Sequence, residues 1–213
     1  MNLNKMIENC NLINERIDYI INNSEFELST KYLVYIHETL FKVIIFDYGK
    51  IRKHNISKGQ DILNGQSIAY PDYHTIYTYL KFAFEDEKRF NYDNKSLDDV
   101  IEHITKFCAE LWLIHPFSEG NTRTVCIFIQ KYLDQLGYKT NNYDFKRHSE
   151  YYRNCLVKAS YCNEELEITG DIVPLKNFIY NIITGNTENI FYEDLRVGQL
   201  FSVNSKKKTL FRM

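Results

Sequence analysis

One short loop of this 213-residue chain gathers residue types that together suit chemistry at a phosphate group. Residues 115–123 are His-Pro-Phe-Ser-Glu-Gly-Asn-Thr-Arg, and an apolar pattern of helical spacing begins where they end. The first turn of a helix offers backbone N–H groups and the positive end of the helix dipole, and both favour a bound anion. Arg123 in that turn opposes the dipole by about 0.3–1 kcal/mol, and a bound phosphate removes this conflict. The pattern therefore predicts an anion site at the start of this helix.

Two other side chains of the loop suit catalysis at such a phosphate. Histidine titrates near neutral pH, so His115 suits a general base. Glu119 is a hard oxygen ligand of the kind that holds Mg²⁺ on substrate phosphates. Taken singly, a histidine at a helix end is more commonly a cap, and Gly-Asn more commonly a turn. Four compatible groups within nine residues favour the phosphate site.

The elements that position this loop are predicted to be mainly α-helical. Gly and Pro are scarce, at 8 and 3 residues, and apolar residues recur at helical spacing. Pro116 ends the helix before the loop, and Gly137 ends the helix after it. Asn64-Gly65 suits a tight hairpin turn, whose central residues both need positive φ. We expect helices at about 7–21, 29–40, 75–84, 96–114, 123–136, 149–160 and 174–183, with a small β-hairpin between the second and third.

Composition excludes several classes of protein. With 26 basic and 28 acidic residues the net charge is −2, which argues against binding of nucleic acid or membrane by bulk electrostatics. The five cysteines form no C-x-x-C pair, which favours a reducing compartment, and the histidines show no metal-ligand spacing. No apolar stretch approaches the roughly 20 residues that span a bilayer, and the first residues lack the pattern of a signal peptide. We expect a cytoplasmic protein.

The loop resembles the signature of the Fic (filamentation induced by cAMP) domain family, H-P-F-x-[DE]-G-N-G-R-x-x-R. It departs from this signature at two positions, where Thr122 replaces a Gly and Cys126 replaces the second Arg. Weaker likeness extends through Gly49-Lys50-Ile51-Arg52 and residues 148–154. The resemblance implies a mainly α Fic fold, a helical bundle with a small β-hairpin flap over the active loop. We expect the following division: an N-terminal helix in 1–28 that packs on the core, the Fic domain in 29–183, and a C-terminal extension in 184–213.

The resemblance also implies an activity and a role for each residue of the loop. Most members of the family are protein adenylyltransferases, which transfer AMP from ATP to a hydroxyl side chain of a target protein. His115 would be the general base, and Glu119 would hold Mg²⁺ on the phosphates of the ATP cosubstrate. The phosphates would be bound by Gly120, Asn121, Thr122 and Arg123.

Two further groups of residues are assigned by the same resemblance. Ser67, Ile68 and Ala69 of the hairpin would bind an extended segment of the target protein by strand addition. Tyr151 and Tyr152 fall where the family places an aromatic ring beside the adenosine. The alternative for these tyrosines, which lie at helical spacing, is the protein core.

A weak inhibitory motif lies after the last predicted helix. Thr184 to Asn189 matches the family pattern [ST]-x-x-x-E-[GN], with Glu188 as the inhibitory residue. Gly185 and Asn186 are poor residues for a helix interior, and the arginine with which Glu188 would pair is Cys126. A plain turn is the favoured alternative, which leaves room for a separate inhibitory, antitoxin-like protein.

Two other functions remain open at this point. Because Cys126 leaves the recognition of the γ-phosphate unexplained, a Fic-fold phosphotransferase, or a transferase that uses another nucleotide, is the first alternative. The second is a non-catalytic nucleotide-binding module in a toxin–antitoxin pair.

Overall fold

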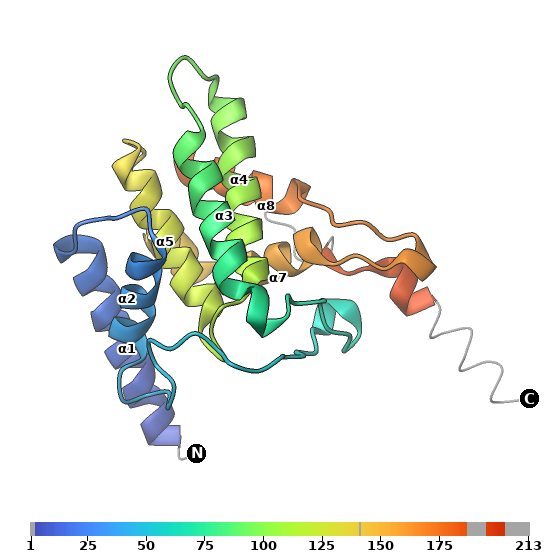
Figure 1. The fold of residues 1–213 in the computed structure, drawn as a ribbon, viewed down its shortest axis with the longest axis horizontal. Coiled ribbons are helices and arrows are strands. Elements are labelled where there is room, and N and C mark those ends of the chain that lie inside the picture. Colours follow the sequence, from blue (N-terminus) through green and yellow to red (C-terminus); the bar gives the residue numbers. More distant parts are fainter. Residues whose placement is uncertain (1–2, 141, 187–194, 203–213) are drawn as a thin grey trace, which may run out of the picture. The chain divides into compact units, whose positions relative to one another are not determined.

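The computed structural model describes residues 3–140, 142–186 and 195–202 and is mainly helical (Figure 1). The described residues contain no β-strand. No helix among them is both long enough and apolar enough to cross a membrane. The elements are α1 (Leu3–Asn23), α2 (Thr30–Phe41), α3 (Ile76–Arg89), α4 (Leu97–Ile114), α5 (Asn121–Gln135), α6 (Asn142–Arg147), α7 (Ser149–Ser160) and α8 (Val173–Thr184), with short 3-10 helices at Asp61–Leu63, Tyr73–Thr75 and Glu164–Leu166.

The chain folds into two compact units, each built from several stretches of sequence. Unit 1 consists of Met1–Asn55, Pro71–Asn94 and Ile114–Asn142. Unit 2 consists of Ile56–Tyr70, Lys95–Leu113 and Tyr143–Met213. The loop at 115–123 therefore belongs to unit 1, together with α1, α2, α3 and α5.

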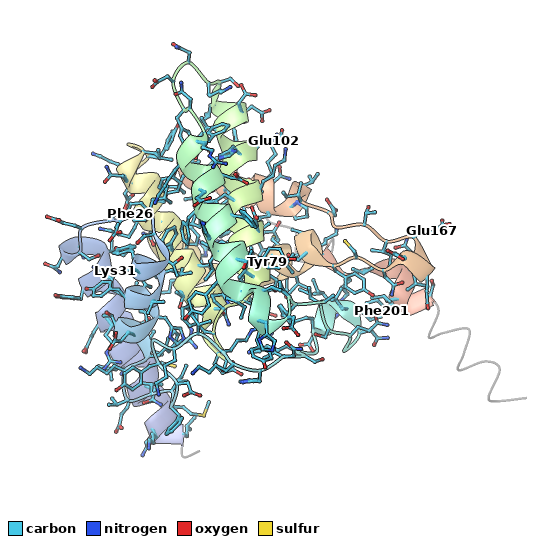
Figure 2. All side chains as sticks on the ribbon, in the orientation of Figure 1. Phe26, Lys31, Tyr79, Glu102, Glu167 and Phe201 are labelled. Atoms are coloured by element: carbon cyan, nitrogen blue, oxygen red, sulfur yellow. The ribbon has the colours of Figure 1, made fainter. Side chains whose placement is uncertain are left out.

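In unit 1, α2 packs on α5 and α1 packs on α2. An aromatic cluster in the connection from α1 to α2 supports this packing. Figure 2 labels Phe26 in this connection. Its ring lies 5.2 Å from the rings of Tyr32 and Phe128 and 5.4 Å from that of Tyr132, measured between centroids. Such aromatic pairs add about 0.5–1.5 kcal/mol each beyond their buried area.

Long cationic side chains fasten the ends of α1 and α2. Arg16 on α1 donates hydrogen bonds to two carbonyls at the end of α2, those of Leu40 (3.0 Å) and Lys42 (2.9 Å). Lys131 on α5 donates to two carbonyls at the end of α1, those of Ile21 (3.0 Å) and Ser24 (2.8 Å). The last carbonyls of a helix lack partners within it, so these contacts stabilise both helix ends.

The helix α3 runs beyond its predicted end near residue 84, as far as Arg89. The apolar pattern of this helix stops at residue 84, but Glu87 in its last turn is buried. Its carboxylate accepts hydrogen bonds of 2.5 Å from the hydroxyls of Tyr92 and Tyr132. This buried contact extends the helix where the apolar pattern stops.

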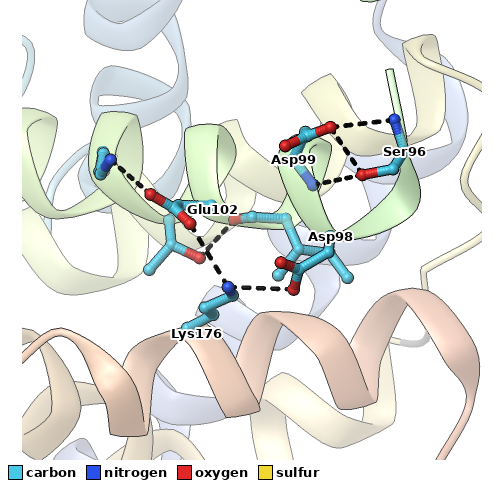
Figure 3. Close-up of polar contacts among 8 residues, drawn as sticks. Ser96, Asp98, Asp99, Glu102 and Lys176 are labelled. Atoms are coloured by element: carbon cyan, nitrogen blue, oxygen red, sulfur yellow. Dashed lines mark hydrogen bonds and ion pairs between the residues drawn. The ribbon is translucent and has the colours of Figure 1, made fainter. Parts of the chain in front are cut away.

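In unit 2, α4 begins at Leu97, next to the expected start at residue 96. The Ser96 hydroxyl accepts a hydrogen bond from the backbone N–H of Asp99, and the Asp99 carboxylate accepts one from the backbone N–H of Ser96 (Figure 3). This is the reciprocal capping box. Nearby, Lys176 on α8 pairs with Asp98 at 3.0 Å and with Glu102 at 3.5 Å, which joins α8 to α4 (Figure 3).

The predicted turn at Asn64-Gly65 forms, but the strands on either side of it do not appear in the described residues. Asn64 has φ +53° and Gly65 φ +83°, as the turn requires. The only antiparallel bridge in this described segment joins Gly59 and Ser67. Ile62 and Leu63 are neighbours and both buried, which a strand with alternating faces does not allow, and they lie in a 3-10 turn instead.

Candidate active site

The active loop begins where α4 ends, at His115. This residue has φ +48°, in the left-handed region that few residues other than glycine adopt. One left-handed residue after the last helical one is a common way to end a helix. His115 is buried, at 4% exposure, and its carbonyl accepts a hydrogen bond of 2.8 Å from Nε of Arg52. The backbone of the predicted general base is therefore fixed by the helix end and by a buried arginine.

Asn121 holds the middle of the loop in place. Its side-chain oxygen accepts a hydrogen bond from the backbone N–H of Phe117 at 2.9 Å, and its side-chain nitrogen donates to the carbonyl of Phe117 at 2.7 Å. Both residues are buried. The amide group of Asn121 is thus used to close the loop, which leaves its backbone N–H as the group that suits a phosphate.

Gly120 caps α5 in a place that only glycine can fill. Its φ is +80°, and a Cβ atom there would lie 2.4 Å from Cε2 of Phe41 on α2. Its carbonyl accepts hydrogen bonds from the backbone N–H and the hydroxyl of Thr124, both at 3.1 Å, which closes the first turn of α5. Because Gly120 has no side chain, it cannot cap the N–H groups of that turn as Ser or Asp would. A helix start of this form suits an anionic ligand.

Arg123 adds a positive charge to the helix start. Its guanidinium lies over the ring of Phe41, 4.8 Å from the centroid. Partial burial of the guanidinium lowers the pKa of Arg123, whereas the nearby Cys10 and Glu119 act in the opposite direction. An arginine stays charged in proteins through shifts of this kind. The predicted combination of a helix N-terminus and a cation is thus present at this loop.

His37 is a second histidine at the loop, but its ring is fully engaged. Its Nδ1 accepts a hydrogen bond from the backbone N–H of Gly49 at 2.9 Å, so Nε2 carries the proton and donates to the carbonyl of Glu119 at 3.0 Å. The ring stacks on Phe117 with centroids 3.8 Å apart. Burial lowers the pKa of His37 to about 4. His37 is therefore a buried histidine with both ring nitrogens bonded, and it cannot serve as the general base.

Glu119 fits a magnesium ion that also binds substrate phosphates. Its side chain is exposed, and its backbone is fixed through the bond to His37. Within the described part of the chain no three His, Cys, Asp or Glu side chains gather closely enough to hold a metal ion on their own. Mg²⁺ typically takes one or two carboxylates from a protein and its other ligands from phosphates and water. The carboxylate of Glu119 beside an anion site matches this requirement.

The other residues predicted to contact the nucleotide or the target lie in unit 2. The Ser67 hydroxyl accepts from the N–H of Lys58 and donates to the carbonyl of Ile68, both at 2.9 Å. The side chain of Ile68 is buried and that of Ala69 is exposed. Ser67 forms a bridge with Gly59 across the turn, and Ile68 and Ala69 follow it outside any strand, so binding of a target segment stays a prediction.

Tyr151 and Tyr152 are buried in unit 2, at 4% and 1% exposure. Both rings pack near that of Phe178, with centroids 5.9 and 5.2 Å away. The hydroxyl of Tyr152 also lies 3.1 Å from Sγ of Cys108. These contacts agree with the alternative of a core role, and a contact with adenosine stays a prediction.

The inhibitory motif falls only partly within the described residues. Thr184 ends α8 and its hydroxyl donates to the carbonyl of Tyr180 at 2.8 Å. Gly185 follows with φ +71°, which is typical of a helix C-cap. Glu188 lies outside the described residues.

Two residues that shape the site were not assigned a role from the sequence. Phe41 supports both Gly120 and Arg123, and Arg52 binds the backbone at His115. Arg52 stands in a stretch that already showed likeness to the Fic family, and that likeness was the one available signal. Contacts to backbone carbonyls leave no periodic pattern in a sequence.

Comparisons with known proteins agree with this fold. The family model described as "Fic/DOC family" matches residues 27–133. No curated protein matches the chain. Among solved structures, the N-terminal Fic domain of Bep8 from Bartonella sp. 1-1C is 17% identical with a TM-score of 0.67, covering 90% of this chain and 91% of that one.

Two further solved structures contain a nucleotide. BepC from Bartonella tribocorum with bound AMPPNP is 19% identical with a TM-score of 0.65, over 85% of this chain and 87% of that one. The N-terminal Fic domain of a cell filamentation protein from Bartonella quintana with bound ADP is 17% identical with a TM-score of 0.60, over 85% and 86%.

Proposed function

Because the chain belongs to the Fic/DOC family, we propose that it is a protein adenylyltransferase, which transfers AMP from ATP to a hydroxyl side chain of a target protein. The observation that carries the proposal is the loop at 115–123. One short stretch combines a helix start capped by glycine, the exposed side chains of Arg123 and Glu119, and a backbone at His115 that Arg52 holds by a hydrogen bond. The AMPPNP and ADP found in two similar structures support a nucleotide as the ligand.

In the proposed reaction, His115 takes the proton of the target hydroxyl. The hydroxyl oxygen then attacks the α-phosphorus of ATP, the bond from that phosphorus to the oxygen of the β-phosphate breaks, and pyrophosphate leaves. The N–H groups at the start of α5 and the guanidinium of Arg123 stabilise the negative charge of the phosphates. Mg²⁺ held by Glu119 would neutralise further phosphate charge. Reactions at phosphorus depend mainly on such positioning and charge stabilisation.

The assignment of the general base follows from the contacts of the two histidines at the loop. Both ring nitrogens of His37 are occupied, and its pKa is held at about 4. A group of that kind accepts no proton at neutral pH. His115 is then the histidine of this loop that suits the role, in agreement with its place in the family signature.

A second candidate function rests on Cys126. This residue is half-buried on α5, one turn after Arg123, where the family signature has its second arginine. Without that charge the γ-phosphate loses one expected partner, so ATP could bind in another orientation and present its γ-phosphate to the target. The product would then carry a phosphate rather than AMP.

We test the proposal by incubating the purified protein with Mg²⁺ and ATP labelled at either the α- or the γ-phosphate, alone and with cell lysate proteins. Label on protein from α-labelled ATP only, lost in His115→Ala and retained in His74→Ala, is the expected result. His74 is an exposed histidine outside the loop and serves as the matched control.

The other outcomes overturn the proposal in distinct ways. Label on protein from γ-labelled ATP identifies a phosphotransferase. Transfer that survives His115→Ala removes the assigned base. Nucleotide binding with no transfer from any of the four ribonucleoside triphosphates identifies the non-catalytic binding module.

A further inference from the structure

The strongest unassigned feature of unit 1 is the buried side chain of Arg52. It is 3% exposed, and its guanidinium donates to three backbone carbonyls. These are the carbonyls of His115 at 2.8 Å, His54 at 2.8 Å and Pro71 at 2.7 Å. Its own backbone N–H donates to the carbonyl of Pro116, also at 2.8 Å. One residue therefore joins the active loop to two other stretches of the chain.

Those two stretches are the ends of the segment 56–70, in which the sequence predicts the target-binding hairpin. The chain leaves unit 1 after Asn55 and returns to it at Pro71. We call residues 54–55 and 71–73 the neck of this segment. Arg52 binds both sides of the neck, at His54 and at Pro71.

Asn55 fastens the neck independently of Arg52. Its side-chain nitrogen donates to the carboxylate of Asp72 at 2.8 Å, and its side-chain oxygen accepts from the backbone N–H of Tyr73 at 3.0 Å. The two sides of the neck are thus held together by side chains rather than by a ladder of strands. Only Arg52, among these contacts, also reaches the active loop.

We propose that Arg52 is a positioning residue that couples the backbone of His115 to the neck of segment 56–70. This inference rests on the proposed function, in which His115 is the base and segment 56–70 binds the target. A planar guanidinium with five donors suits the task, because it holds three carbonyls in one fixed geometry. A change in the neck is thereby transmitted to His115, so that target binding and proton transfer depend on one side chain.

The nucleotide-binding end of the loop is held by other contacts. Asn121 binds Phe117, Phe41 lies against Gly120, and His37 binds the carbonyl of Glu119. Loss of the Arg52 contacts is therefore expected to spare nucleotide affinity. Unchanged nucleotide affinity in an Arg52 variant would therefore distinguish a coupling role of Arg52 from a general role in the stability of the fold.

The test compares Arg52→Lys with Lys53→Met. Lysine keeps the charge but cannot hold three carbonyls in a fork, whereas Lys53→Met removes an exposed neighbouring charge and keeps the Arg52 contacts. In Arg52→Lys we expect faster amide hydrogen exchange both at the neck and at His115 and Phe117, with the affinity for AMPPNP within about twofold of wild type. Lys53→Met should match the wild type in both measurements.

In the labelling assay, Arg52→Lys is expected to lower kcat about tenfold or more and to raise KM for the protein target. Faster exchange confined to the neck, or confined to the loop, overturns the coupling. So does a loss of AMPPNP affinity that equals the loss in kcat. The exchange measurement needs no catalytic activity, so it tests the coupling even if the chain transfers no nucleotide.

If Arg52→Lys does not fold, Asn55→Ala tests the same coupling between the neck and His115. This variant loosens the neck and leaves Arg52 intact. Faster exchange at His115 and Phe117 in Asn55→Ala supports the coupling, because among the contacts named above for the neck it is those of Arg52 that reach the loop. Faster exchange at the neck alone overturns it.

Discussion

A Cβ atom on Gly120 would lie 2.4 Å from Cε2 of Phe41, far inside van der Waals contact. The start of α5 and the ring beneath it therefore fit only while residue 120 is glycine. We predict that Gly120→Ala lowers the free energy of unfolding by about 2–4 kcal/mol, from overpacking and from the left-handed backbone together. Affinity for AMPPNP should fall with it, because the ring and the helix start must move apart.

Gly137→Ala is the matched control for this change. Gly137 also has a left-handed backbone, with φ +90°, but nothing lies within 4 Å of the Cβ position. Gly137→Ala should therefore lower the free energy of unfolding only by the cost of the left-handed backbone, about 1–2 kcal/mol, as measured by urea unfolding. Equal losses in the two variants would show that the approach of Phe41 contributes nothing.

Asn121→Ala is predicted to open the active loop. It leaves the buried N–H and carbonyl of Phe117 without their partner, at a cost of about 2–4 kcal/mol in unfolding free energy. The check is urea unfolding together with calorimetry of AMPPNP binding, which should weaken. Asn22→Ala, which removes an exposed amide bonded within α1, should stay within about 0.5 kcal/mol of wild type.

The buried ring of His37 predicts a loss of stability in acid. Its pKa is about 4 in the folded chain, mainly because of burial, against a usual value of 6.5. Between these pH values the unfolded chain binds the extra proton, so stability is highest above pH 6.5 and falls as the pH is lowered to about 4. Over this pH range the titration of His37 removes about 3 kcal/mol from the free energy of unfolding.

Urea unfolding at a series of pH values from 7.5 to 4, in metal-free buffer, measures the slope of the free energy of unfolding against pH. His37→Gln should reduce it, because glutamine retains a donor and an acceptor but does not titrate. His74→Gln, at an exposed histidine, should retain the full slope. An unchanged slope in His37→Gln would assign the acid sensitivity to other groups.

Four of the five cysteines are predicted to react in two classes, and the half-buried Cys126 belongs to neither. Cys108 and Cys155 are buried, and burial raises the pKa of each thiol to about 12, so neither forms the reactive thiolate in the folded protein. Cys10 and Cys162 are exposed. A thiol-specific chromogenic disulfide should label Cys10 and Cys162 within minutes, and Cys108 and Cys155 only in denaturant. Mass spectrometry of the peptides identifies the sites, and native labelling of Cys108 or Cys155 contradicts the packing described for unit 2.

Residues with strong local rules were predictable from the sequence. Ser96 and Asp99 cap α4 reciprocally, and Asn64 and Gly65 take the positive φ that their turn needs. Caps and turns depend on neighbours a few positions apart, so the information lies within one short window. The helix start at the end of the loop 115–123 was predictable for the same reason, and the roles of the loop residues in catalysis stay predictions.

Features that depend on distant contacts were not predictable in this way. The strands expected around the turn are replaced by a 3-10 turn because Ile62 and Leu63 are both buried in unit 2. The helix α3 is extended by a contact between Glu87 and Tyr132, 45 positions apart. Arg52 binds carbonyls, which every residue has, so no residue type at 115 or 71 could indicate its partners.

The contacts of α1 determine which fragments of this chain can fold. The family match begins at residue 27, after α1 has ended, yet Arg16 binds the last carbonyls of α2 and Lys131 binds those of α1. A fragment trimmed to residues 27–133 would leave the end of α2 uncapped and the ammonium of Lys131 without the carbonyls that it binds. It would also end within α5, whose start carries the proposed anion site. For expression and crystallisation, the smallest sound boundary on the N-terminal side therefore precedes α1, well outside the segment 27–133 that matches the family model.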